Sequence, residues 1–267
     1  RRRSSNFFLF AFISCTAIVQ SGLSRAGLMI FALGTIIVVA LSIADRLTRR
    51  RLGVVVGLSC IAVVGLALTL DTIVKRFYDY GNEESAKTRE MLNESSRWML
   101  EDYPLGVGWN NFAVTINYPY PYSENIDYWQ KINNDPVDKN YKKGIVESLW
   151  WLLLSETGYQ GFATYLLFIA MFLWWNLRNA IYYRREYLGA VSVGLLVGSS
   201  MNYLQSFLEH VLTQPRNIFL WLTLLAITAR ITTWRKGEQI QLKREREEQI
   251  AEQKRLLLEE DEEAAVA

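Results

Sequence analysis

The chain has 267 residues, of which 51% are hydrophobic and 21% are charged, and its formal net charge at pH 7 is +2. So small a positive excess gives no reason to expect a nucleic-acid partner. The mean hydropathy is +0.05. A chain that is half hydrophobic has so neutral an average only if its apolar residues are gathered into separate blocks.

Such blocks, nearly free of charged residues, recur along the chain at 7–22, 27–44, 53–70, 159–177, 188–206 and 217–233. Each is long enough to cross the ~30 Å hydrocarbon core of a bilayer as a helix. Trp174, Trp175, Trp221 and Trp234 lie at or near block edges, as is typical of membrane interfaces. One block alone also fits a buried helix of a soluble domain. Together they predict an all-α, polytopic integral membrane protein with about six transmembrane helices in a lipid bilayer.

The chain opens with Arg1-Arg2-Arg3 and runs into the first apolar block without a small-residue cleavage site. We therefore expect it to be the C-terminal part of a longer membrane protein. Cys15 and Cys60 both lie inside apolar blocks, where they fit small packing residues better than a disulfide.

Clusters of Lys and Arg alternate with the apolar blocks. They comprise Arg1 to Arg3, Arg46 with Arg49 to Arg51, Arg178 with Arg184 and Arg185, and Arg230 with Arg235 and Lys236. If the blocks are successive crossings, all these clusters fall on one face, which the positive-inside rule makes cytoplasmic. The chain then divides into transmembrane helices over 1–70, a large periplasmic loop over 71–144, a re-entrant or interfacial helix plus transmembrane helices over 145–235, and a charged cytoplasmic helical tail over 236–267.

The polar segment 71–144 is long for a connection in a compact protein, and loops of that length usually carry function or are disordered. Good helix formers over 83–101 predict a helix that Pro104 ends. Its apolar face would comprise Met91, Leu92, Trp98 and Met99. Arg89 and Arg97 would then overlook one cavity, unless each pairs with a nearby Glu of the same helix.

Arg25 follows Ser24 at the predicted outer end of one crossing. An arginine there is either a snorkelling anchor or, because it lies opposite the usual cytoplasmic anchors, part of an anion site. Guanidinium groups match phosphate oxygens in two-point contacts. Arg25, Arg89 and Arg97 on one face could therefore hold a lipid-linked pyrophosphate.

Two further features lie on the same face. The stretch Gly106-Val107-Gly108-Trp109-Asn110-Asn111 is either a tight turn or a place where backbone and amides approach a sugar or phosphate. After the loop, Glu147 and Glu156 bound a short apolar helix. Either carboxylate could accept a proton from a sugar hydroxyl, or could serve as a helix cap or structural hydrogen-bond partner.

The only histidine, His210, fits a membrane-boundary residue better than a catalytic base. No cluster of His, Cys and carboxylates has metal-ligand spacing. We therefore expect neither a bound metal nor another cofactor, although Asp135 and Asp138 could hold a metal weakly.

Three sequence pieces carry a resemblance: Ser24-Arg25-Ala26-Gly27; Arg89, fifteen residues before Pro104-Leu105-Gly106-Val107-Gly108 with Asn111-Phe112; and Glu147, nine residues before Glu156-Thr157-Gly158. Over about residues 5–235 the chain resembles the C-terminal half of the O-antigen ligase and polymerase superfamily of bacterial membrane proteins. The resemblance implies a metal-independent, inverting glycosyltransferase of the inner membrane. It would move a glycan from undecaprenyl pyrophosphate to an acceptor hydroxyl at the periplasmic face, in surface polysaccharide synthesis.

In that reading Arg25 and Arg89 bind the pyrophosphate, and Glu147 stands where the family has a histidine base. A carboxylate can still orient or accept the proton. Substrate contacts would come from Ser24, Arg97, Trp109, Asn110, Asn111 and Glu156, with Trp129 and the rings at 118–122 as sugar platforms. The acceptor, a glycan, lipid or protein, stays open, and so does the choice between ligase and polymerase. A transporter or membrane scaffold is the non-enzymatic alternative.

Overall fold

The computed structural model describes residues 25–45, 81–133, 143–210 and 213–266, with the isolated positions 14, 53 and 57. Of these residues 82% are helical and none is in a strand, which confirms the all-α class for the described part of the chain. The elements are α2 (Arg25–Asp45), α4 (Gly81–Asp102), α5 (Phe112–Thr115), the 3-10 turn η1 (Pro121–Ser123), α6 (Glu124–Ile132), α7 (Leu149–Tyr182), α8 (Tyr187–Gln205) and α9 (Pro215–Val266).

Among the described residues, three stretches of helix are long and apolar enough to cross a membrane, and they are Leu149–Tyr182, Tyr187–Gln205 and Asn217–Leu256. They correspond to the last three predicted blocks. The predicted block 27–44 lies within α2, whose apolar part, Met29–Leu41, is shorter. The predicted blocks 7–22 and 53–70 lie outside the described residues, apart from positions 14, 53 and 57. Three of the six predicted crossings are therefore matched by a helix of spanning length.

The outward faces of α7 and α9 carry apolar side chains that are exposed. Leu167 is 71% exposed and Phe219 is 73% exposed. Contiguous apolar surface of this kind marks a contact with lipid or with protein. In helices of this length and composition, it fits contact with a lipid bilayer.

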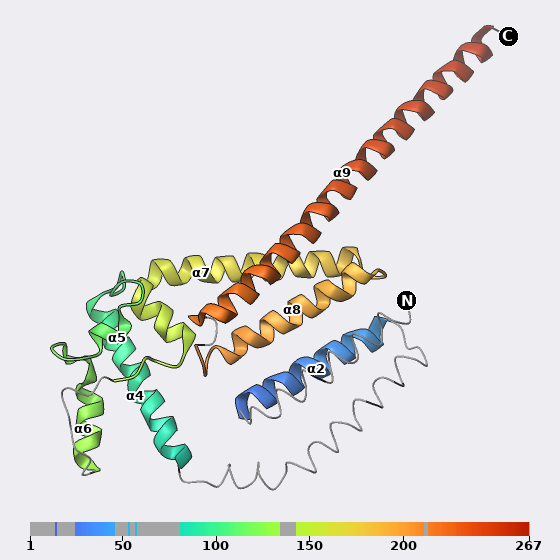
Figure 1. Ribbon diagram of the computed structural model, residues 1–267. Helices are drawn as coiled ribbons and strands as arrows, with labels where there is room; N and C mark the ends of the chain where they lie inside the picture. Colours follow the sequence, from blue (N-terminus) through green and yellow to red (C-terminus); the bar gives the residue numbers. More distant parts are fainter. Residues whose placement is uncertain are drawn as a thin grey trace.

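The long helices pack in alternating directions. The N–H of Leu149, at the start of α7, donates to the carbonyl of Ser206, just after α8 (2.9 Å). Further along, Thr228 donates to Asn176 (3.1 Å) and Asn179 donates to Thr232 (2.9 Å). The helices α7 and α9 thus run the same way and α8 runs opposite, with α2 packed on α8 (Figure 1). Beyond these contacts α9 continues as one long helix away from the others (Figure 1).

The helices α4, α5 and α6 gather beside the start of α7 and form a small core of their own (Figure 1). The predicted helix over 83–101 is confirmed, because α4 ends at Asp102, before Pro104. Its predicted apolar face is also confirmed, since Met91, Leu92 and Met99 are buried and Trp98 is partly buried against the same core. Phe112, Ile116 and Val146, each 0% exposed, complete that core from other elements.

One residue breaks α7. Gly158 has φ 65° and ψ −172°, which separates a short helix over 149–157 from the long helix that follows. The short apolar helix predicted between Glu147 and Gly158 is therefore present, and it begins after Ser148. This break lets the start of α7 turn toward α4 and α5.

Candidate functional site

The turn after α4 is pressed against the break in α7. Gly106, Gly108 and Asn110 all have positive φ, at 87°, 100° and 60°. The N–H of Val107 donates to the Ser155 carbonyl (2.9 Å), and that of Gly108 donates to the Glu156 carbonyl (3.0 Å). The glycines are therefore needed for close approach of this backbone to α7. This geometry favours the tight-turn alternative over direct approach of the turn to a ligand.

The fit is close enough to exclude any side chain at Gly106. A Cβ atom there would lie 2.3 Å from the Glu156 carbonyl oxygen. The same holds at Gly158, where a Cβ atom would lie 2.3 Å from the Pro104 carbonyl oxygen. Gly106 and Gly158 thus each pack against the chain segment that holds the other, and this close packing accounts for both glycines.

Glu156 lies beneath this turn. Its side chain is 7% exposed, and its Oε1 accepts a hydrogen bond from the N–H of Phe112 (3.2 Å). That N–H belongs to the first turn of α5, where backbone donors have no partner inside the helix. Of the alternatives that the sequence left open, the structural hydrogen bond is the one observed.

Arg89 and Glu147 come together although they are 58 residues apart. The Nε of Arg89 donates to Oε2 of Glu147 in an ion pair between α4 and the segment that leads into α7. The two side chains are 42% and 41% exposed. Two of the three predicted catalytic residues thus form one half-open site, within reach of solutes.

Glu147 is held in place from both sides. Val146 before it is fully buried in the core of the loop, and Ser148 after it is also buried. Leu149 is fixed to Ser206 by the backbone hydrogen bond already described. The carboxylate therefore projects from an immobilised backbone.

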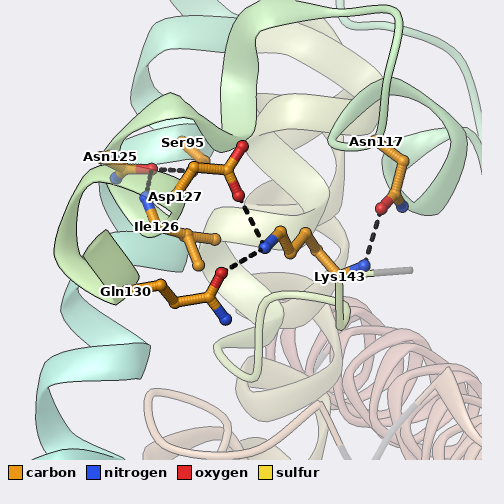
Figure 2. A network of polar contacts seen from close by, with 7 residues as sticks. All are labelled: Ser95, Asn117, Asn125, Ile126, Asp127, Gln130 and Lys143. Atoms are coloured by element: carbon orange, nitrogen blue, oxygen red, sulfur yellow. Dashed lines mark hydrogen bonds and ion pairs between the residues drawn. The ribbon is translucent and has the colours of Figure 1, made fainter. Parts of the chain in front are cut away.

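A further anchor lies four residues earlier, at Lys143 (Figure 2). Its ammonium group pairs with Asp127 (2.7 Å) and donates to Gln130 (3.0 Å), both on α6. Its backbone N–H donates to Oδ1 of Asn117 (2.7 Å). The Lys143 side chain is only 7% exposed, so this ion pair is largely shielded from water. Sequence reasoning missed the anchor, because the partners are scattered over the loop without a motif.

The other predicted site residues are placed differently. Arg97 pairs with Glu101 of its own helix (2.9 Å), and both side chains are mostly exposed. Trp109 is 68% exposed, and Asn110 beside it is exposed too. The amide of Asn111 is used within the turn, where it donates to the Val107 carbonyl (3.1 Å).

The two remaining predicted residues stand at the edge of the described chain. Arg25 is the first residue of α2, and its side chain lies outside the described part of the structure. Ser24 lies outside the described residues altogether. The predicted meeting of Arg25 with Arg89 therefore stays a prediction.

The expected sugar platform at 118–122 is wrong in part. Tyr122 is 5% exposed and donates to Asp102 (2.7 Å). Burial, together with the Asp102 carboxylate, raises the pKa of Tyr122 above its ordinary value. Trp129 is partly buried against the loop core. Tyr118, at 71% exposed, and Tyr120, at 43%, keep accessible rings.

Within the described ranges, no group of three or more His, Cys, Asp and Glu side chains is arranged to hold a metal ion. In the part of the chain that the structure describes, fold and site together define an all-α arrangement with three helices of membrane-spanning length and a half-open Arg89–Glu147 pair beside them. Comparison of the chain with protein-family models, with curated proteins and with solved structures gives no match.

Proposed function

We propose that this chain is a glycosyltransferase of the bacterial inner membrane that moves a glycan from undecaprenyl pyrophosphate to an acceptor hydroxyl at the periplasmic face. The observation that carries the proposal is the ion pair between Arg89 and Glu147. It unites an anion-binding group with a proton acceptor, two functions that such a transfer needs. The resemblance in sequence motifs supports a ligase or a polymerase of that superfamily, and the choice between these two stays open.

The proposed chemistry begins with exchange of partners at Arg89. Within the described residues its guanidinium is bonded to Glu147 through Nε, which leaves both Nη groups to meet phosphate oxygens. A half-exposed ion pair is worth only about 0–1 kcal/mol, so a doubly charged pyrophosphate competes for the guanidinium at small cost. Binding of the donor then frees the Glu147 carboxylate.

Glu147 next takes the proton of the acceptor hydroxyl as the hydroxyl oxygen forms a bond to the anomeric carbon of the donor sugar. The bond from that carbon to the pyrophosphate oxygen breaks, and its electron pair leaves with undecaprenyl pyrophosphate. Attack from the side opposite the leaving group inverts the anomeric centre. Arg89, and Arg25 in this proposal, offset the charge on the leaving group. Trp109, Tyr118 and Tyr120 supply exposed rings for sugars.

The membrane arrangement belongs to the same proposal. The loop 71–144 lies on the periplasmic face, and the tail 236–267 lies in the cytoplasm. The three spanning helices and the common side of the Arg178 and Arg235 clusters support this orientation. The crossings at 7–22 and 53–70 complete the six helices that we propose.

The test compares variants of the site in transfer from an undecaprenyl-pyrophosphate-linked glycan in membranes. Arg89→Lys and Arg89→Ala are each expected to lower kcat by about 10²–10³. Glu147→Gln is expected to lower it by about 10²–10⁴, because the amide cannot accept the proton. The matched control is Arg97→Gln, because Arg97 lies on the same helix in an exposed pair of its own.

Full activity of Arg89→Ala would remove the proposed role of the ion pair. Analysis of the products separates the remaining choices, because a polymerase lengthens the glycan whereas a ligase changes its anchor. Glycan flux in liposomes that lack acceptor would instead favour the transporter.

A further inference from the structure

Two arginines at the far end of α7 and α9 differ from the cations of the loop. In the loop, Arg89, Arg97 and Lys143 each pair with a carboxylate. Among the described residues, neither Arg178 nor Arg235 has such a partner. Within the described part of the chain, their positive charge is therefore not neutralised by an ion pair.

Arg235 is fixed beneath the surface. Its side chain is 4% exposed, and its Nε donates to Oδ1 of Asn179 on α7 (2.9 Å). The Asn179 amide in turn donates to Thr232 (2.9 Å). The asparagine thus uses both ends of its side chain to hold α9, and it fixes the guanidinium beside the end of α7.

Arg178 precedes this asparagine in the chain and lies on the surface. Its guanidinium stands 5.7 Å from the ring centre of Trp174, one turn earlier, which orients it. Asn179, the acceptor for Arg235, follows Arg178 directly in the chain, so both arginines lie at the same end of α7. Two guanidiniums at one end of α7, neither in an ion pair within the described residues, are matched by an anion from outside the protein. Phosphate oxygens fit such groups best.

The surroundings indicate where that phosphate comes from. Trp174 is 54% exposed, Leu177 is 38% exposed and Ile181 is 66% exposed, all on α7 next to Arg178. An aromatic and aliphatic surface at the end of a spanning helix is where acyl chains begin. A free phosphate would make no use of it.

We propose that the exposed Arg178, with the Arg235 guanidinium fixed beneath it, binds the phosphate of an anionic phospholipid headgroup whose acyl chains lie along the exposed face of α7. Basic groups between helices at a membrane surface bind anionic headgroups in this way. The site is independent of the glycan transfer proposed above and lies at the opposite end of α7. Its occupant would complete the charge balance at the junction of α7 and α9.

Two carboxylates at this end, Glu186 and Glu238, oppose the anion, since both act on Tyr183. Burial and the Glu238 carboxylate raise the pKa of Tyr183, at the end of α7, to about 12. Because Glu238 acts on this region, its neutralisation in Glu238→Gln is expected to strengthen headgroup binding. A lipid held elsewhere on the protein would not respond to this change.

The test titrates the purified full chain, in detergent, with phosphatidylglycerol and follows binding by native mass spectrometry. Phosphatidylcholine and inorganic phosphate are the comparison probes. Arg178→Gln is expected to weaken phosphatidylglycerol binding by about 10-fold, and Arg235→Lys by a similar factor, because lysine lacks the planar fork. Lys236→Gln is the matched control, since it removes the same charge at the same end, and we expect a change of less than about 2-fold.

Equal weakening by Lys236→Gln and Arg178→Gln would overturn the proposal, because it would show only a general attraction of basic surface for anionic lipid. Equal binding of phosphatidylcholine would overturn it as well. Displacement of the lipid by millimolar inorganic phosphate would show a phosphate site without a lipid preference, and would overturn the assignment to a phospholipid. Arg178 is exposed, so its variant is expected to fold, and thermal unfolding of each variant checks this.

Discussion

The arginines at the two ends of α7 have different partners: a carboxylate at the start and neutral groups at the end. At its start, Arg89 is bonded to the Glu147 carboxylate, and both groups are half exposed. At its end, Arg235 is buried against the Asn179 amide, and Arg178 lies over an indole ring. A half-exposed ion pair can exchange partners at small cost. A guanidinium bonded to a neutral amide has no carboxylate to exchange, and its charge is not offset by that partner. The first arrangement suits a site that turns over, and the second suits a permanent contact.

The largest effect on stability is expected from Gly106→Ala. This variant tests whether the Arg89–Glu147 pair at the start of α7 depends on the packing of the turn against α7. Alanine at φ 87° is strained, and its Cβ would meet a backbone oxygen at 2.3 Å. We expect a loss of about 3 kcal/mol or more in stability, with release of the loop from α7. Thermal unfolding and limited proteolysis of the loop measure this.

Gly144→Ala is the control for that variant. Gly144 lies in the same loop, and a Cβ atom there would meet nothing within 4 Å. It should unfold and resist protease like the unmodified protein. If Gly106→Ala behaved like this control, the loop would not depend on its contact with the break in α7.

A smaller effect is expected at the other end, from Asn179→Leu. Leucine is of similar size but leaves the buried Arg235 guanidinium without its acceptor and Thr232 without its donor. Loss of a buried partner to a charged group costs about 2–3 kcal/mol. Thermal unfolding in detergent measures the change. Asn202→Leu, the same replacement at an exposed position of α8, should leave the unfolding temperature nearly unchanged.

The helices of this chain were predictable because each depends on local patterns. Apolar runs predicted α7, α8 and the apolar first part of α9, and the spacing of Met91, Leu92 and Met99 predicted the buried face of α4. Pro104 marked the end of that helix. Such signals need only neighbours in sequence, so the sequence alone suffices to read them.

The site was predictable only as a set of candidates. The sequence named both Arg89 and Glu147, yet their ion pair joins residues 58 apart and depends on how the loop folds. From the sequence, Glu156 could be either a proton acceptor or a structural hydrogen-bond partner. Its burial and its hydrogen bond to the Phe112 N–H, which only the structure shows, favour the structural role. The contact of Lys143 with Asp127 follows no local rule at all, because charged residues in a polar loop have many alternative partners.

The smallest expected effect concerns Tyr122, the ring that the sequence placed on the surface and the structure places inside. Tyr122→Phe keeps the buried ring but removes the hydrogen bond to Asp102 (2.7 Å). A loss of about 1 kcal/mol is expected at pH 7, because the net value of such a bond is small. Tyr128→Phe on α6, where the ring is 67% exposed, is the control and should change almost nothing.

The pH dependence makes this prediction sharper. Because burial and Asp102 raise the pKa of Tyr122, the folded protein keeps this phenol neutral at a pH where the unfolded chain already ionises it. The stabilisation by Tyr122 is therefore fully present below about pH 10, the ordinary tyrosine pKa, and is lost as the pH rises above it. The difference in unfolding temperature between the unmodified protein and Tyr122→Phe should stay constant up to about pH 9.5 and then shrink. A difference that stayed constant up to about pH 11 would mean that the Tyr122 hydroxyl ionises alike in the folded and unfolded protein, as an exposed phenol does, and would contradict the burial of Tyr122 in the loop core.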